Sequence, residues 1–148
     1  MVSLFGLIRT RVRQVFVLAR IVAQGALRTS VAPKDSTRSF VFVGPANSAG
    51  QGFQWARSLE RARPEITAIN MQLSADDVFR FNADISVHSA IAAYSKRWQR
   101  KQRESLLGYK AVLVESNRAV CGAWLGGNVA EQVAELQTSG VQVGLIFH

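Results

Sequence analysis

The sequence predicts an α/β fold: a Rossmann-like parallel sheet of about five strands flanked by helices and preceded by a basic amphipathic helix. Short apolar segments alternate along the chain with amphipathic segments of about a dozen residues, which implies parallel strands joined by helical crossovers. The 148 residues, 48% of them hydrophobic, suffice for the core of one domain and are too few for two domains of ordinary size.

Residues 1–38 form a basic leader and linker. They carry seven Lys or Arg and one acid, a net charge of +6, whereas residues 39–148 carry eleven Lys or Arg and nine acids, a net charge of +2. Apolar residues and arginines intermingle up to Leu27 without a proline, so we expect a helix. No uncharged stretch reaches the roughly 20 residues of a membrane span, and the arginines lie inside the apolar stretch, unlike those of a signal peptide. Two interpretations remain open: a helix lying on an anionic membrane surface, and a helix packed on its own domain.

The first strands and helices of the body, residues 39–148, follow from local composition. Residues 39–43 are rich in β-branched and aromatic side chains and end at a Gly-Pro pair, as a buried strand does. Residues 51–63 carry apolar side chains at helical spacing and precede a proline, and residues 65–70 form a second strand. Ser74, with an acid three residues later, predicts the start of a further helix.

The rest of the body repeats this alternation. Residues 84–88 form a short third strand, and residues 110–115 are almost wholly apolar, as strands covered on both faces are. Between them, residues 89–107 predict a single helix. Its inner face would hold Ile91, Tyr94, Trp98 and Leu106. The last helix and strand are residues 128–138 and residues 141–148.

Polar residues gather at the carboxyl ends of the predicted strands, where ligands bind in open parallel sheets. They are Asn47, Gly50 and Gly52 after the first strand, His88 after the third, Glu115 and Asn117 after the fourth, and His148 in the fifth. The glycine loop before the first helix of the body offers backbone N–H groups to a phosphate or a sugar hydroxyl, although its spacing matches no nucleotide-binding fingerprint. Strand ends are polar in any α/β domain, so the alternative is a surface without a ligand.

Other classes of site are disfavoured. Cys121 is the single cysteine, which excludes an internal disulfide, and no Cys/His spacing predicts a metal site or a resident cofactor. A reducing compartment, the cytoplasm, suits such a sequence. The basic run at residues 96–103 surrounds Trp98 and raises nucleic acid as a partner. We expect no nucleic acid, because these cations lie toward the carboxyl end of the predicted helix, where they suit its dipole.

Residues 40–61 and 111–148, with the basic leader, resemble the amino-terminal domain of GT-B glycosyltransferases of the retaining group 1 type. The first segment reads FVFVGPANSAGQGFQWARSLER and looks like bacterial members in which a glycine loop opens the first helix. The resemblance implies an enzyme of two facing Rossmann-like domains, the first receiving the acceptor and the second holding a nucleotide-sugar. By that resemblance, Gly50 and Gly52 approach the donor phosphate. The catalytic candidates are His148 and Glu115, and the substrate-binding candidates are Asn47, Gly50, Gly52, His88 and Asn117.

We therefore expect the acceptor-side half of a glycosyltransferase, incomplete and inactive without a second domain or chain. Its partners would be a nucleotide-sugar donor and a glycan or lipid-linked acceptor of the cell envelope, with peripheral attachment to the inner face of the plasma membrane. The alternative is a non-catalytic Rossmann-like module that binds a partner protein or an anionic membrane surface.

Overall fold

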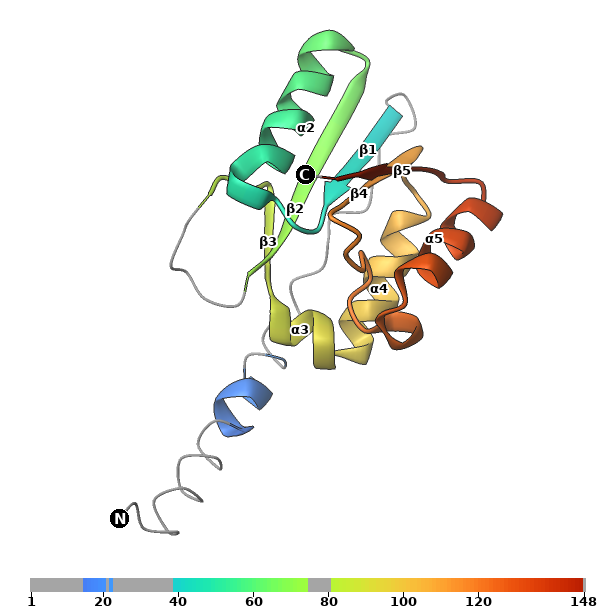
Figure 1. The fold of residues 1–148 in the computed structure, drawn as a ribbon. Helices are drawn as coiled ribbons and strands as arrows, with labels where there is room; N and C mark the ends of the chain where they lie inside the picture. Colours follow the sequence, from blue (N-terminus) through green and yellow to red (C-terminus); the bar gives the residue numbers. More distant parts are fainter. Residues whose placement is uncertain (1–14, 21, 23–38, 75–80, 148) are drawn as a thin grey trace, which may run out of the picture.

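A computed structural model describes residues 15–20, 22, 39–74 and 81–147 of the chain. The described residues form a five-stranded parallel sheet with helices on both faces, which is the predicted α/β, Rossmann-like arrangement (Figure 1). The strands are β1 (Ser39–Gly44), β2 (Ile66–Ser74), β3 (Ile85–His88), β4 (Ala111–Glu115) and β5 (Gln142–Ile146). The labelled helices are α2 (Gln51–Ala62), α3 (Ser89–Tyr94), α4 (Lys96–Leu106) and α5 (Val129–Thr138), with short 3₁₀ turns η1 (Ser48–Gly50) and η2 (Trp124–Gly127).

The strand order across the sheet is β3-β2-β1-β4-β5, and every neighbouring pair is parallel. Phe42 of β1 pairs with Ile69 of β2 on one side and with Val112 of β4 on the other, so β1 is central. Since all strands are parallel, their carboxyl ends share one edge of the sheet. The chain leaves β1 toward β2 and later returns to place β4 on the opposite side of β1. The order of the strands therefore reverses between β1 and β4, at the point where such sheets bind ligands.

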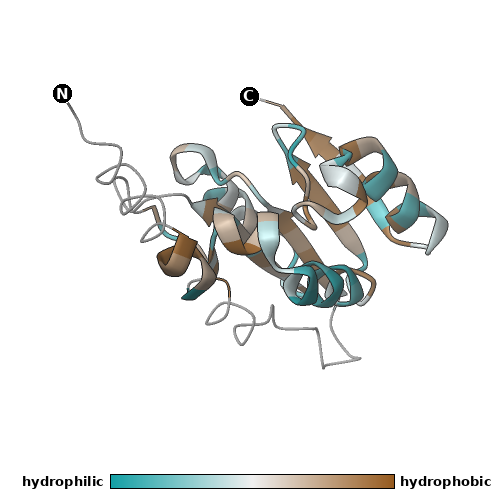
Figure 2. Cartoon of the chain, turned by 90° about the horizontal axis from the view of Figure 1, so that it is seen from below, coloured by the Kyte–Doolittle hydropathy of each residue, from teal (hydrophilic) through white to brown (hydrophobic). Residues whose placement is uncertain are grey.

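The two faces of the sheet are covered by different helices. α2 packs through Ala56 on Val41, Val43 and Ala68, whereas Phe42 belongs to the larger core under α3, α4 and α5. Successive residues of β1 enter different cores because strand side chains alternate between faces. Figure 1 shows α2 on one side of the sheet and the other three helices on the opposite side, and Figure 2 shows hydrophobic strands lying between helices that carry hydrophilic residues.

The predictions for β4 and α5 are confirmed. Asn128 precedes α5, and its Oδ1 atom accepts a hydrogen bond from the N–H of Glu131 at 3.3 Å. Gly140 follows the helix with a φ of 88°, a left-handed conformation that glycine adopts without steric cost. Local chemistry therefore sets both ends of this helix.

β2 extends beyond the predicted strand to Ser74. Residues 71–74 pair with residues 85–88 of β3, which supply hydrogen-bond partners for the added length. Ser74, predicted to cap a further helix, is the last residue of β2 and pairs with His88. The remainder of that predicted helix falls on residues 75–80, which lie outside the described residues.

The prediction of one helix over residues 89–107 is wrong, because Ser95 separates α3 from α4. Ser95 has extended backbone angles (φ −88°, ψ 96°), and its side chain accepts a hydrogen bond from the N–H of Trp98 at 3.2 Å. Ser95 therefore caps a new helix. Tyr94, expected on the inner face, is exposed because α3 ends there, whereas Ile91, Trp98 and Leu106 are buried as predicted.

This break reverses the interpretation of the basic run. Lys96 and Arg97 are the first two residues of α4, and the first turn contains no acid. They lie at the positive end of the helix dipole, where a cation is unfavourable, and only Arg103 lies in the last turn. The helix dipole therefore does not explain why so many cations stand here.

The amino-terminal helix is present in the described part of the leader, at residues 15–20 and 22 (Figure 1). Its basic amphipathic character was predicted over residues 1–27, most of which lie outside the described residues. No helix in the described ranges is both long enough and apolar enough to cross a membrane.

Candidate functional site

Two loops meet at the point where the strand order reverses. We call them the β1 loop (residues 45–50) and the β4 loop (residues 116–123), because each follows the strand of that number. β1 and β4 are hydrogen-bonded neighbours, with Gly44 paired to Val114, so the loops leave adjacent strands at the same edge. The carboxyl-edge residues of the two central strands are thus brought together, as the strand pattern predicts.

Glu115, the last residue of β4, connects the two loops. Its side chain is fully buried, and its Oε2 atom accepts a hydrogen bond from the backbone N–H of Asn47 at 2.8 Å. A Cβ atom at Gly52 would lie only 2.6 Å from the same oxygen, so the carboxylate rests against the first turn of α2. A carboxylate near a helix N-terminus is stabilised by the helix dipole. Glu115 thus holds the β1 loop and the start of α2 in position.

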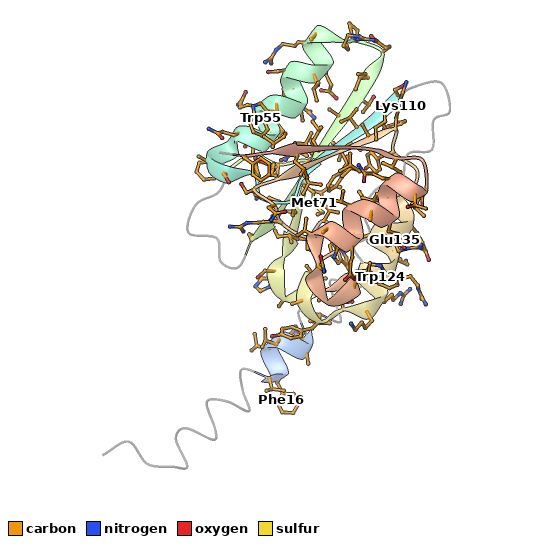
Figure 3. All side chains as sticks on the ribbon, turned by 45° about the vertical axis from the view of Figure 1, so that its right-hand side comes forward. Phe16, Trp55, Met71, Lys110, Trp124 and Glu135 are labelled. Atoms are coloured by element: carbon orange, nitrogen blue, oxygen red, sulfur yellow. The ribbon has the colours of Figure 1, made fainter. Side chains whose placement is uncertain are left out.

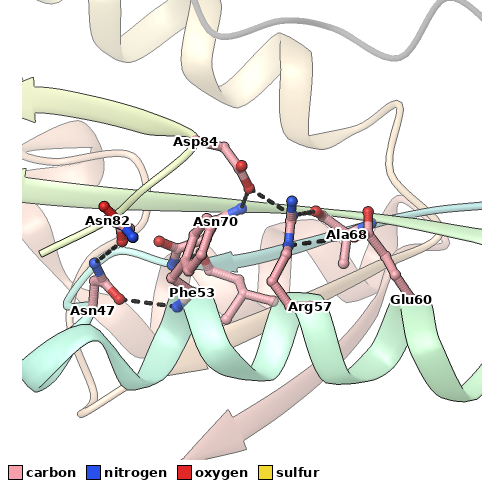
Figure 4. A network of polar contacts seen from close by, with 9 residues as sticks. Asn47, Phe53, Arg57, Glu60, Ala68, Asn70, Asn82 and Asp84 are labelled. Carbon is pink, nitrogen blue, oxygen red and sulfur yellow. Dashed lines mark hydrogen bonds and ion pairs between the residues drawn. The ribbon is translucent and has the colours of Figure 1, made fainter.

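Asn47 organises the β1 loop around itself (Figure 4). Its backbone is left-handed, with a φ of 48°. Its side-chain Oδ1 accepts from the N–H of Phe53 at 2.9 Å, and its Nδ2 donates to Gln72 Oε1 at 2.9 Å and to the carbonyl of Asn82 at 3.0 Å. One buried amide therefore ties the loop to α2, to β2 and to the segment that enters β3.

The backbone donors of this loop are largely engaged within the protein. The N–H of Gly50 donates to the carbonyl of Asn47 at 3.0 Å, and the N–H of Gln51 donates to the carbonyl of Ser48. The N–H groups of Asn47 and Phe53 bond to Glu115 and to the Asn47 side chain. A phosphate bound by these four N–H groups would have to displace contacts that already satisfy them.

Asn70, the last residue of the predicted strand at residues 65–70, lies inside β2 because β2 continues to Ser74. It is fully buried, and its Nδ2 donates to the carbonyl of Val43 at 3.1 Å. Its backbone N–H donates to Asp84 Oδ2 at 2.8 Å, and the same carboxylate oxygen accepts from Arg57 at 2.9 Å. This network, drawn in Figure 4, supports α2 and β2 below the loop. Sequence reasoning missed Asp84, Gln72 and Asn82, because nothing local marks their long-range contacts.

The other predicted site residues lie elsewhere. His88 ends β3, two strands from β1 in the sheet, and its Nδ1 accepts from the N–H of Ala90 at 3.1 Å, which caps α3. Asn117 lies in the β4 loop and is exposed. His148 lies outside the described residues. The structure therefore brings Asn47, Gly50, Gly52 and Glu115 together, places Asn117 on the adjoining loop and leaves His88 apart.

Unusual backbone conformations concentrate in the same two loops. Of the five non-glycine residues with positive φ in the described ranges, four lie there: Asn47, Ala49, Ser116 and Asn117. Residues in this conformation cost about 1–3 kcal/mol each and cluster at functional sites, where the surrounding structure maintains them. Ser116 is held by its backbone N–H, which donates to the carbonyl of Ile146 at 2.8 Å.

A nucleophilic or metal site is not found in the described part of the chain. Residues 15–20, 22, 39–74 and 81–147 contain no cluster of three or more His, Cys, Asp or Glu side chains that could hold a metal ion. Burial raises the pKa of the Cys121 thiol to about 12, with a further rise from Glu135 and an opposing effect of Arg103. The thiol is therefore protonated at neutral pH, and only the thiolate is an effective nucleophile.

Comparison with protein-family models, with curated proteins and with solved structures finds no match to this chain. The function is therefore inferred from the sheet, the two loops and the residues within them.

Proposed function

We propose that this chain is the acceptor-side domain of a sugar-transferring enzyme of the GT-B type. A hydroxyl-rich ligand binds at the carboxyl edge of the sheet, between the β1 loop and the β4 loop. The parallel sheet and its reversal between β1 and β4 support this location, because ligands of open α/β sheets bind outside such a reversal.

The observation that carries the proposal is that two polar loops lie side by side at this position, each with residues in the left-handed backbone conformation. Asn117 is exposed and Ser116 and Ser48 are half-buried, so amide and hydroxyl groups face the loops' surroundings from both sides. Such groups donate and accept hydrogen bonds, as the hydroxyls of a sugar do. The strained backbone of Ser116 and Asn117 gives their positions a cost that ligand binding would explain.

Within this proposal the residues have different roles. Asn117 contacts the acceptor directly, while Glu115 is a positioning residue that holds the β1 loop through Asn47. Gly52 keeps the space that the Glu115 carboxylate fills. Transfer itself requires a second domain that binds the nucleotide-sugar. Gly50 approaches the donor phosphate, and His148 stays a catalytic candidate.

A titration followed by nuclear magnetic resonance tests the location. Isotopically labelled protein is titrated with uridine- and guanosine-diphosphate sugars and with methyl glycosides. We expect shift changes confined to residues 44–52 and 115–118. Asn117→Gly keeps the left-handed backbone and removes the amide, so it should weaken binding roughly three- to tenfold. Gln142→Ala, an exposed position at the amino end of β5, is the matched control and should leave binding unchanged.

Shift changes at the amino end of the sheet, or equal binding by the Asn117→Gly and wild-type proteins, would contradict the proposed location. A separate assay supplies a GT-B donor domain in trans and measures sugar transfer. Binding without any transfer would indicate a sugar-binding module in place of an enzyme domain.

A further inference from the structure

The helical segment at residues 15–20 exposes large apolar side chains in succession. The exposed fractions of Val15, Phe16, Val17 and Leu18 are 65%, 72%, 52% and 37%. Successive helical residues are about 100° apart, so four in a row present apolar surface around most of the helix. Figure 3 shows Phe16 on the side of this segment that faces away from the sheet. Contiguous exposed apolar surface is uncommon on soluble domains and marks an interaction site.

A second unexplained feature, the basic run of α4, lies nearby. Lys96, Arg97 and Arg100 are exposed and Lys101 is half-buried, and none of the four forms an ion pair with another described residue. The first two stand at the positive end of the helix dipole, where they destabilise the helix. A stabilising role within the fold therefore does not account for them, whereas an anionic partner would.

The apolar and cationic features share one end of the molecule. The segment at residues 15–20 lies beside α3, and α3 leads directly into the start of α4 (Figures 1 and 3). Tyr94 stands at the junction of α3 and α4 and is 68% exposed. Tyrosine is favoured where an apolar medium meets water, since its ring is apolar and its hydroxyl is polar. We call residues 15–18, Tyr94 and the cations of α4 the basic end.

We propose that the basic end binds an anionic lipid bilayer, with the cations of α4 against the headgroups and Val15, Phe16, Val17 and Leu18 within the headgroup boundary. Charge complementarity selects the anionic lipid. The exposed apolar run favours a bilayer over nucleic acid, because phosphate contacts require cations and do not require aliphatic side chains. Interfacial helices bind in this way, through apolar side chains and basic residues together. The inference does not depend on the proposed sugar site, which lies in loops at the carboxyl edge of the sheet.

Vesicle sedimentation with the full chain tests this proposal. We expect binding to vesicles of phosphatidylcholine mixed with phosphatidylglycerol, little binding to phosphatidylcholine alone, and a fall in binding as salt is raised. The triple variant Lys96→Gln, Arg97→Gln and Arg100→Gln should bind about a hundredfold more weakly, because each cation near an anionic surface contributes about fivefold. Its matched control is Arg61→Gln, Arg63→Gln and Lys110→Gln, which removes three exposed cations elsewhere and should bind like the wild type.

Phe16→Ser tests the apolar component, and it should weaken binding to anionic vesicles without changing its dependence on salt. Circular dichroism confirms that each variant retains its fold. Equal losses in the two triple variants would overturn the proposal, since the effect would then reflect net charge and not this surface. Absence of vesicle binding by the wild-type chain would also overturn it. Self-association in sedimentation velocity that Phe16→Ser abolishes, without lipid binding, would assign the surface to a second copy of the chain.

Discussion

Replacing Gly52 by alanine tests the packing that joins the candidate site to the fold. The new Cβ atom would lie 2.6 Å from Glu115 Oε2, 2.7 Å from Asn70 Nδ2 and 2.9 Å from Glu115 Cδ. Both neighbours are fully buried and hydrogen-bonded, Glu115 to the N–H of Asn47 and Asn70 to the carbonyl of Val43. Neither side chain can move aside without breaking one of these bonds.

The expected cost combines three effects. Overpacking a buried site costs about 1–3 kcal/mol, and losing the bond between Asn47 and the Glu115 carboxylate costs about 1.5–3 kcal/mol. Alanine is about 1 kcal/mol better than glycine inside a helix, which offsets part of this. The free energy of unfolding should therefore fall by about 2–5 kcal/mol, and Tm by about 5–20 °C for a chain of this length.

Urea unfolding followed by circular dichroism measures the change. Gln54→Ala, at an exposed position of the same helix, is the control and should stay within about 0.5 kcal/mol of the wild type. In a double-mutant cycle with Glu115→Ala, the alanine at position 52 should cost less than it does in the wild type, because the Glu115 contacts are gone and only the contact with Asn70 Nδ2 at 2.7 Å remains. A Gly52→Ala protein as stable as the wild type would refute the claim that the carboxylate requires glycine here.

Three further predictions concern the loop, the helix break and the buried ionisable groups. Asn47→Gly keeps the left-handed backbone but loses three side-chain hydrogen bonds, so the free energy of unfolding in urea should fall by about 1–3 kcal/mol. Asn117→Gly, at an exposed left-handed position, is the control and should not lower the free energy of unfolding. Ser95→Ala removes the cap of α4 and should lower the free energy of unfolding by about 1 kcal/mol, while Ser95→Thr should retain most of it in the same assay. Burial raises the pKa of Cys121 from 9.0 to about 12, and burial, with a contribution from Asp84, raises that of Tyr109 from 10.0 to about 12. As the pH rises, the unfolded chain loses these two protons at a lower pH than the folded chain does. The free energy of unfolding should therefore be unaffected by them below pH 9 and should fall between pH 9 and pH 12, by about 1.4 kcal/mol per pH unit from the thiol. Urea unfolding at each pH measures this slope, and Cys121→Ala should remove the part that the thiol contributes.

The fold prediction is correct where a segment's own residues contain the signals that define it. β4 is apolar because helices cover both faces of the sheet at its centre, and α5 has a capping asparagine before it and a left-handed glycine after it. Neither feature requires knowledge of a distant residue. Both elements could therefore be predicted from the sequence.

The errors arose where distant contacts decide the structure. Residues 71–74 are strand because β3 pairs with them, and their own sequence shows no clear strand pattern. The break at Ser95 was missed for a different reason. Ile91, Trp98 and Leu106 are all buried, so the apolar spacing continues across the break and conceals it. The serine cap was the available signal, and apolar periodicity outweighed it.

The location of the candidate site could be predicted, but its internal chemistry could not. Parallel strands align their carboxyl ends, so the loops after β1 and β4 were expected to meet. The bond between Asn47 and Glu115 joins residues 68 apart in the sequence, and the burial of Glu115 depends on α2 lying over it. A strand-terminal glutamate is more often a surface group than a buried anchor, and only the packed structure distinguishes the two.

The buried carboxylate also constrains how this edge of the sheet can recognise a ligand. The N–H groups of Asn47, Gly50, Gln51 and Phe53 are satisfied by protein oxygens, so they gain little from a ligand that must first displace those oxygens. The Asn117 side chain of the β4 loop is exposed, so a ligand can bind it without displacing a protein oxygen. Asn117 suits a hydroxyl, whereas the exposed guanidinium of Arg118 in the same loop suits a phosphate. It follows that donor phosphate binding, if it occurs at α2, must be accompanied by movement of the β1 loop away from Glu115.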